Sequence, residues 1–161
     1  MKIGWIVLGG AGLFFGGRYL WQMNRLNTNL EMVINAKLHS VTLAGITIRV
    51  DVTLKNPTKG KIKIMFPFVK IMHDGKTIGS SQSVNKEIEI PSFGQAVIEA
   101  IMIDITFSQL LINAWSMYQL VKEGKPVVVQ VKVLSTIKML WGDQPYEQTQ
   151  DITLKGATTT P

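Results

Sequence analysis

Side chains that commonly carry out chemistry are few in this chain, and their spacing forms no catalytic pattern. The sequence contains two histidines, His39 and His73, and no cysteine. Each histidine falls in or at the end of a predicted strand, with no serine, aspartate or metal-ligand partner at a recognisable spacing. The lack of cysteine excludes disulfides, zinc–cysteine sites, thiol nucleophiles and lipid attachment through cysteine. We therefore expect both histidines to be structural or exposed.

Two carboxylates and a glycine-rich stretch are the other candidates for chemistry. Glu87 and Glu89 lie two residues apart, so on a strand they project from the same face, as a carboxylate pair would. Lys86 stands beside them, and the pattern favours a solvated face. Residues 8–17, LGGAGLFFGG, lack both the lysine–serine ending of a phosphate-binding loop and a preceding strand. The sequence therefore predicts no enzyme, no cofactor and no metal site.

The most concentrated charge follows the clearest predicted strand and consists of Lys55, Lys59, Lys61 and Lys63. Such a cluster can contact lipid headgroups, nucleic acid or an acidic partner, or it can simply be a solvated loop. No aromatic side chain that could stack on bases is interleaved with these lysines. The net charge of +6 includes three basic residues before residue 29, so the rest is weakly basic. Nucleic acid is not expected as a partner.

Residues 1–21 predict a hydrophobic helix that anchors the chain in a membrane. Fifteen uncharged residues separate Lys2 from Arg18, and the apolar stretch continues through Trp21 if Arg18 snorkels. Gly12 and Gly16 form a G-x-x-x-G pair that would let another helix pack closely in lipid. The side chains expected to contact the bilayer are Ile3, Trp5, Ile6, Val7, Leu8, Leu13, Phe14, Phe15, Tyr19, Leu20 and Trp21.

A cleaved signal peptide is the alternative interpretation of this segment, because a lysine followed by a short apolar run also fits a secretory leader. The orientation stays open, because Lys2 on one side competes with Arg18 and Arg25 on the other. We expect a membrane-associated, single-pass chain, with residues 22–29 as a linker to the folded domain. A location inside a viral particle or envelope assembly is the alternative.

Strand patterns dominate the chain from residue 30 onward. Residues 46–54 alternate apolar and polar side chains, and Asn56-Pro57 ends this run. Residues 62–72 predict another strand, in which Pro67 implies an edge or a bulge. Asp74-Gly75 then predicts a tight hairpin turn. Further strands are expected at 84–90, at 95–106 with one irregularity, and at 127–133 and 146–154.

One helix is predicted over residues 107–122, with Ser108 as its cap and Gly124 just past its end. The apolar positions at helical spacing, expected to face the core, are Leu111, Ala114, Trp115, Tyr118 and Val121. A turn region at Gly142-Asp143 and Pro145 separates the last two strands. Trp141 beside that turn is expected to be exposed and is an interface candidate.

These elements predict an all-β domain over residues 30–155, followed by a flexible tail at 156–161. Short strands separated by regular turn signals are typical of an antiparallel β-sandwich of the immunoglobulin or fibronectin III type. One helix late in the domain and a hydrophobic helix before it complete the expected architecture.

Two stretches carry a resemblance to a known family. VDVTLKNPT at residues 50–58 and FPFVKIMHDGKTIGSS at residues 66–81 resemble the type 2 late embryogenesis abundant family, whose domain is also called the water-stress and hypersensitive-response (WHy) domain. The family turn pattern matches at Asn56, Pro57, Asp74, Gly75 and Gly79, whereas Thr58 is a minor departure. The resemblance covers about residues 30–155.

The resemblance implies an immunoglobulin-like sandwich, often tethered by an N-terminal anchor, that binds, protects or supports other molecules without catalysis. The expected partners are a lipid bilayer through residues 3–21 and other protein chains, including copies of this one. A structural subunit of a large assembly, such as an envelope complex or a membrane-containing virion, is one alternative. A carrier that holds an apolar ligand inside the sandwich is another.

Overall fold

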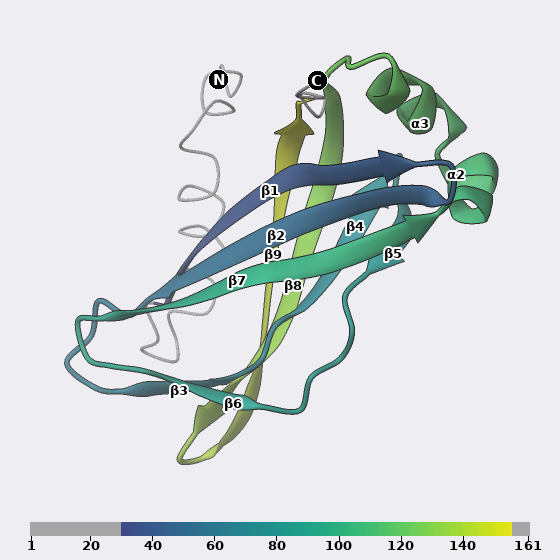
Figure 1. Cartoon of the computed structure of the whole chain (residues 1–161). Helices are drawn as coiled ribbons and strands as arrows, with labels where there is room; N and C mark the ends of the chain where they lie inside the picture. The colour runs from purple at the N-terminus through teal and green to yellow at the C-terminus, as the bar shows by residue number, and fades with distance from the viewer. Residues whose placement is uncertain (1–29, 156–161) are drawn as a thin grey trace, which may run out of the picture.

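The computed structural model describes residues 30–155, which form nine strands and two short helices (Figure 1). The expected anchor helix at 1–21, the linker at 22–29 and the tail at 156–161 lie outside the described residues. Among the described helices, none has the length and apolar character that a membrane crossing requires. The domain is mostly β, as predicted.

The first sheet contains three long strands in the order β1-β2-β7. They are β1 (Glu31–Thr42), β2 (Gly45–Lys55) and β7 (Gln95–Thr106). Both pairings are antiparallel. The predicted alternation in β2 is confirmed, because Ile48, Val50 and Val52 are fully buried while the intervening residues are partly exposed. This period of two places one apolar face of the sheet on the core.

The second sheet is built around one long hairpin, β8 (Val127–Met139) and β9 (Gly142–Leu154). On its other side, β8 pairs first with β4 (Phe68–His73) and then with β3 (Ile62–Met65). β5 (Lys76–Ser80) extends the sheet beyond β4, and β6 (Glu87–Ile90) extends it beyond β3. All these pairings are antiparallel.

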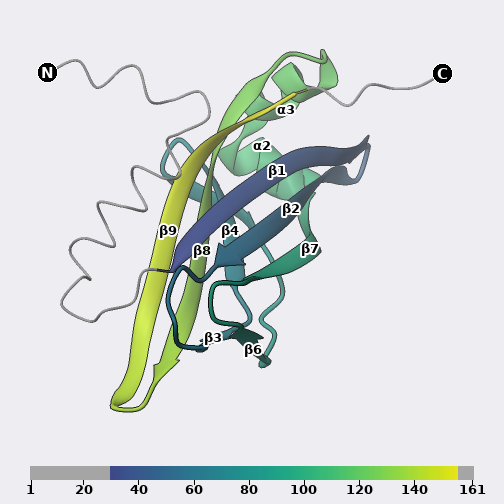
Figure 2. The same ribbon diagram turned by 90° about the vertical axis from the view of Figure 1, so that its left-hand side faces the viewer.

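The two sheets face each other across a core of branched aliphatic side chains and curl together like half a barrel (Figures 1 and 2). One edge is joined by side chains of β9 that reach the backbone of the β1 region. Gln148 Nε2 donates to Met32 O at 3.2 Å, and Tyr146 Oη donates to Leu30 O at 3.5 Å. The opposite edge, between β7 and the segment that follows β5, has no such ladder within the described residues.

The predicted strand at 62–72 is divided into β3 and β4 by Phe66-Pro67. Proline has no N–H for the ladder, so the chain leaves the sheet there and rejoins the same edge of β8 with its register shifted by one residue, which confirms the predicted bulge. The expected turn at 142–145 is wrong. The turn is Leu140-Trp141, and Pro145 lies inside β9 opposite Thr136. β9 is an edge strand, so Pro145, which has no backbone N–H, can lie with its nitrogen on the side facing away from β8.

The single predicted helix is two helices, α2 (Phe107–Asn113) and α3 (Trp115–Lys122). Ala114 interrupts them with φ −153° and ψ 37°, outside the helical region. The cap is Thr106, not Ser108: Thr106 Oγ1 accepts from Gln109 N, and Gln109 Oε1 accepts from Thr106 N.

The break also changes which side chains are buried. The buried positions are Leu110, Ala114, Met117, Tyr118 and Val121. Leu111 and Trp115, expected in the core, are 50% and 41% exposed. The spacing prediction assumed one continuous helix: it is confirmed for Ala114, Tyr118 and Val121 and is wrong for Leu111 and Trp115, which lie on either side of the break.

Candidate binding surfaces

A cleft opens along the free edge of β7 and has a volume of about 550 Å³. β7 is the last strand of its sheet, so every second residue directs its backbone N–H and C=O away from β2. No strand of residues 30–155 pairs with that edge. The facing wall consists of Ser80 at the end of β5, the irregular segment 81–84 that follows it, and Phe66. The cleft therefore places unpaired backbone groups beside a fixed wall.

The wall is held at both ends by hydrogen bonds to its own sheet. Ser81 N donates to Val69 O at 2.8 Å, and Ser81 Oγ accepts from Val69 N at 2.9 Å. At the other end, Phe66 N donates to Lys86 O at 2.7 Å. The cleft is consequently a built feature and not the result of one loose loop.

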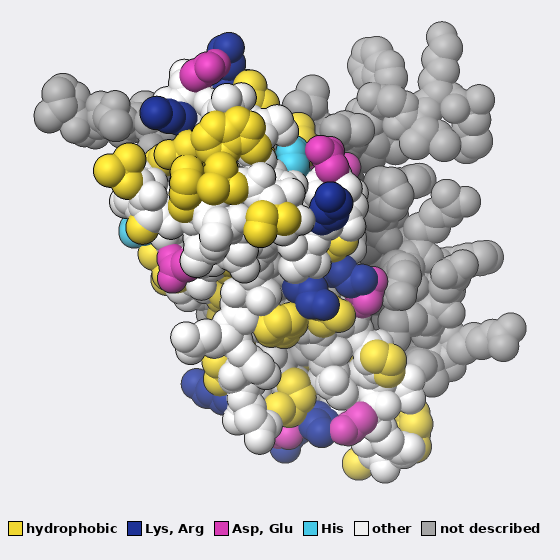
Figure 3. All heavy atoms as spheres, turned by 90° about the vertical axis from the view of Figure 1, so that its right-hand side faces the viewer, with side chains coloured by type: hydrophobic (Ala, Val, Ile, Leu, Met, Phe, Trp, Pro, Cys, Tyr) yellow, Lys and Arg dark blue, Asp and Glu magenta, His cyan; other side chains and the backbone are white. Residues whose placement is uncertain are grey.

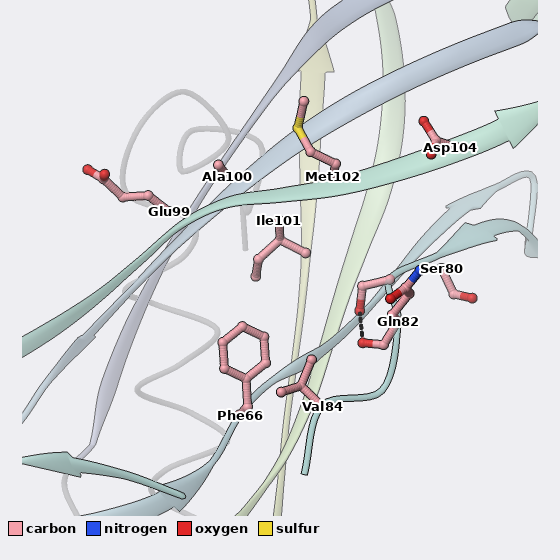
Figure 4. Close-up of a pocket in the computed structure, with 10 residues that line it drawn as sticks. Phe66, Ser80, Gln82, Val84, Glu99, Ala100, Ile101, Met102 and Asp104 are labelled. Carbon is pink, nitrogen blue, oxygen red and sulfur yellow. Dashed lines mark hydrogen bonds between the residues drawn. The ribbon is translucent and has the colours of Figure 1, made fainter. Parts of the chain in front are cut away.

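The cleft has an apolar floor and an acidic rim (Figure 4). Phe66 from the β3–β4 connection, Val84 from the segment after β5 and Ile101 from β7 point toward one another. Glu99 and Asp104 lie on β7 on either side of Ile101. Among the described residues that line the cleft there is no lysine or arginine. Its chemistry fits a ligand with an apolar centre and positive flanks.

A bulge shapes the β7 edge and confirms the predicted irregularity. The register of β2 and β7 shifts between Val50 and Val52, and Ala100 has φ 57°. Asp51 Oδ1 accepts from Ala100 N at 2.7 Å and pairs with Arg49 Nε at 3.0 Å. Burial raises the pKa of Asp51, but the bonds from Ala100 and Arg49 outweigh it and leave the pKa below its usual value.

Asn56, the first residue of the family turn motif, holds two loops together through its side chain. Asn56 is buried, and its Nδ2 donates to Gly60 O at 2.7 Å and to Pro91 O at 3.0 Å. Its Oδ1 accepts from Thr58 N at 3.0 Å and from Thr58 Oγ1 at 2.6 Å. Asn56 therefore joins the loop after β2 to the loop before β7, while Pro57 beside it is exposed.

The glycine positions of the motif have two different explanations. Asp74 and Gly75 have φ 48° and 76°, the left-handed pair of a type I′ turn between β4 and β5, as predicted. Gly79 is buried, and a Cβ there would lie 2.8 Å from Ile105 Cγ1 and 3.1 Å from Ile103 Cγ2. Because Gly79 has no side chain, β5 of the second sheet can approach Ile103 and Ile105 of β7 in the first sheet closely.

The four clustered lysines, Lys55, Lys59, Lys61 and Lys63, are all exposed. Two of them pair with carboxylates of β6: Lys61 Nζ lies 2.9 Å from Glu89 Oε1, and Lys63 Nζ lies 3.3 Å from Glu87 Oε1. The hydrogen bond from Lys61, together with its charge, lowers the pKa of Glu89. The predicted solvated carboxylates and two of the four lysines therefore form two exposed cross-strand ion pairs. Within residues 30–155, Lys55 and Lys59 make no ion pair.

Trp141 is 66% exposed, as expected, and forms the tip of the β8–β9 hairpin with Leu140, which is 101% exposed. At the other end of β8 lies a second apolar surface, the helix-end patch, over the β1–β2 turn, α2 and α3. Figure 3 shows hydrophobic side chains gathered at this end. The exposed members of the helix-end patch are Leu43, Leu111, Ile112 and Trp115.

The sequence did not predict the helix-end patch, because the core was expected to take Leu111 and Trp115. Trp115 stacks on Tyr118 with ring centroids 5.4 Å apart, and Phe107 meets both rings edge-on. The signal that could have located it is Ile112, which no continuous helical stripe accommodates.

The histidines lie apart, His39 exposed on β1 and His73 at the end of β4 with Nδ1 3.3 Å from Val128 O. Within residues 30–155, no three metal-ligating side chains gather at one point.

Comparison with known proteins supports the fold alone. No family model and no curated protein sequence matches the chain. A protein from Archaeoglobus fulgidus is 14% identical with a TM-score of 0.54, covering 79% of this chain and 97% of that one. A protein from Arabidopsis thaliana is 15% identical with a TM-score of 0.52, covering 80% and 82%. A protein provisionally named as late embryogenesis abundant is 15% identical, covers 91% and 82%, and has a TM-score of only 0.43.

Proposed function

We propose that this chain is a non-enzymatic binding module, tethered to a membrane through residues 3–21, that binds an extended segment of a partner protein along β7. The observation that carries the proposal is the cleft beside the free β7 edge. An extended segment laid there would pair with backbone groups that no strand of residues 30–155 pairs with, and its side chains would alternate between the cleft and solvent.

The partner segment should carry an apolar residue flanked by lysine or arginine. The floor at Phe66, Val84 and Ile101 is apolar, and Glu99 and Asp104 make the rim acidic. Backbone pairing supplies affinity that does not depend on sequence, whereas the floor and rim supply the selectivity. The bulge at Ala100 interrupts the edge, so the uninterrupted pairing length is residues 101–106.

We further propose that the domain is an immunoglobulin-like sandwich of the type 2 late embryogenesis abundant (WHy) kind. Support comes from the family turn motif, whose residues have demanding structural positions: Asn56 joins two loops, Asp74 and Gly75 form a left-handed turn, and Gly79 lets two sheets touch. This resemblance favours a binding or protective role over catalysis.

The test of the binding site is selection from a library of random extended peptides, followed by titration against two matched variants. Val84→Arg places a charge in the cleft from a side chain that is 42% exposed. Val128→Arg makes the same change on β8, outside the cleft, where the side chain is 54% exposed. We expect selected peptides to lose binding to Val84→Arg alone and to slow amide hydrogen exchange in residues 101–106. Equal binding to both variants, or no change in exchange at β7, would refute the site.

The test of the tether is fractionation of the full-length chain and of a shortened chain that starts at Leu30. We expect the full-length chain to sediment with membranes and the shortened chain to elute as a folded monomer in size-exclusion chromatography. A full-length chain that stays in the soluble fraction contradicts the tether.

A second candidate function, a structural subunit of a large assembly, is favoured by the helix-end patch. Four exposed apolar side chains at one end of a small domain are typical of a surface that another chain covers. In that case both the full-length and the shortened chain would be recovered only in large particles. The carrier alternative would place an apolar ligand on the cleft floor, and lipid would then copurify with the protein.

A further inference from the structure

The β8–β9 hairpin ends in two apolar side chains that contribute nothing to the core. Leu140 is 101% exposed and Trp141 is 66% exposed. β3 pairs with β8 as far as Lys138, and no other strand of residues 30–155 pairs with the last pair of the hairpin, Met139 and Gly142. In both ribbon views the tip projects past β3 and β6 (Figures 1 and 2). Because both side chains are exposed, packing within the described domain does not explain why a leucine and a tryptophan stand side by side at this tip.

The chemistry of this tip matches the boundary between lipid and water. Tryptophan has an apolar ring body and one N–H donor, and it concentrates at that boundary in membrane proteins. Two lysines lie near the base of the tip: Lys138 is on β8, and Lys63 is its partner across the β3–β8 ladder. Lys138 Nζ is held 2.6 Å from Asp143 Oδ2, on an exposed surface where phosphate headgroups can compete for it.

The tip also lies within reach of the point where the N-terminal segment joins the domain. Leu30 O accepts from Tyr146 Oη, and Tyr146 is five residues from Trp141 on the same hairpin, about 17 Å along the strand. Burial raises the pKa of Tyr146, which keeps the donating hydroxyl protonated. Residues 22–29 span at most about 28 Å when extended. A bilayer that holds residues 3–21 is therefore close enough for the tip to touch.

We propose that Leu140 and Trp141 insert into the interface of the same bilayer that holds the N-terminal segment, as a second point of attachment. This inference rests on the proposed tether and adds an orientation to it. Two attachment points fix the hairpin axis relative to the membrane. β8 extends thirteen residues, about 40 Å, from its start after α3 to the tip, so the helix-end patch faces away from the lipid.

The test uses the cysteine-free sequence, which allows a single labelled position in the full-length chain. Leu140→Cys carries an environment-sensitive fluorophore at the tip and leaves Trp141 in place. Leu43→Cys is the matched control, because Leu43 is also an exposed leucine in a hairpin turn, 90% exposed, and lies at the opposite end beside α2. Both proteins are reconstituted in phosphatidylcholine vesicles with phosphatidylserine, with and without lipids that carry a quencher at the headgroup–acyl boundary.

We expect the label at position 140 to shift to shorter wavelength and to lose most of its emission to the quencher lipid, while the label at position 43 does neither. Adding Trp141→Ser should reduce both effects at position 140. If the chain floats with the vesicles but the two labels behave alike, the tip inference is wrong and the tether stands. If the chain does not float, the tether fails and the second attachment point fails with it.

Discussion

Replacing Asn56 by alanine tests whether one buried side chain holds the two loops at the same end of the domain. The side chain makes four hydrogen bonds of 2.6 to 3.0 Å, two to Thr58 and one each to the carbonyls of Gly60 and Pro91. Each contributes about 1 kcal/mol net. Water can replace part of the bonds to Thr58, which is partly exposed, so we expect a loss of about 3 kcal/mol in the free energy of unfolding.

The assay is thermal unfolding of the full-length protein in mild detergent, followed by far-ultraviolet circular dichroism. A loss of about 3 kcal/mol corresponds to a fall in Tm of roughly 10 °C for a domain of this size. Asn85→Ala is the matched control, because Asn85 is exposed in the loop before β6 and makes no side-chain hydrogen bond within the described residues. We expect its Tm to stay within about 2 °C of the original.

Asn56→Asp separates hydrogen bonding from simple volume loss. An oxygen would replace the amide nitrogen that faces the carbonyls of Gly60 and Pro91, so the ionised form is disfavoured when folded. The pKa of the new carboxyl is then raised on folding, and its destabilising effect should grow as pH rises through the carboxyl range. If Asn56→Ala behaves like Asn85→Ala, the hydrogen bonds of Asn56 do not hold the two loops together and the reasoning is refuted.

Three further changes test other contacts. Gly79→Ala should cost about 1 to 3 kcal/mol in the free energy of unfolding measured in urea, because its Cβ would meet Ile105 Cγ1 at 2.8 Å, and a free energy equal to the original would contradict that packing. Asp51→Ala should cost about 1 kcal/mol at neutral pH through the lost bond to Ala100 N. The pKa of Asp51 is lower in the folded than in the unfolded protein, so its ionised carboxylate stabilises the fold at pH values above the unfolded pKa. This stabilisation is lost as pH falls through the folded pKa, so we expect the free energies of unfolding of Asp51→Ala and of the original protein to become equal in acid. Ile112→Asp should change stability by less than about 0.5 kcal/mol, because the side chain is 77% exposed, yet it should shrink any large particles seen by light scattering if the helix-end patch is an assembly surface.

Local patterns were sufficient where neighbouring residues decide the structure. The alternation of β2 identified its buried face, Asn56-Pro57 ended the strand, and Asp74-Gly75 formed the expected turn. Each depends on side-chain period or backbone preference within a few residues. The irregularity of β7 was also visible, although its cause, the carboxylate of Asp51 on the neighbouring strand, was not.

Predictions failed where distant segments decide the outcome. The ion pairs of Lys61 and Lys63 with Glu89 and Glu87 depend on the register of β3 and β6, which short-range spacing does not specify. A turn region was predicted at Gly142-Asp143 and Pro145 because these residue types are common in turns, whereas pairing with β8 continues through all three. The cleft could not be predicted for the same reason, because its walls come from Phe66, from residues 80–84 and from residues 99–104, which the sheet topology brings together.

The positions of the three surfaces determine which of the proposed functions can operate together. The hairpin tip and the helix-end patch lie at opposite ends of β8, and the cleft runs along the edge opposite the bonds from Tyr146 and Gln148. Membrane contact at the tip leaves both the cleft and the helix-end patch accessible. A tethered chain can therefore bind a partner at β7 and still assemble through its helices, so particle formation alone does not exclude the cleft. Only loss of peptide binding in Val84→Arg, with normal binding in Val128→Arg, separates the binding site from assembly.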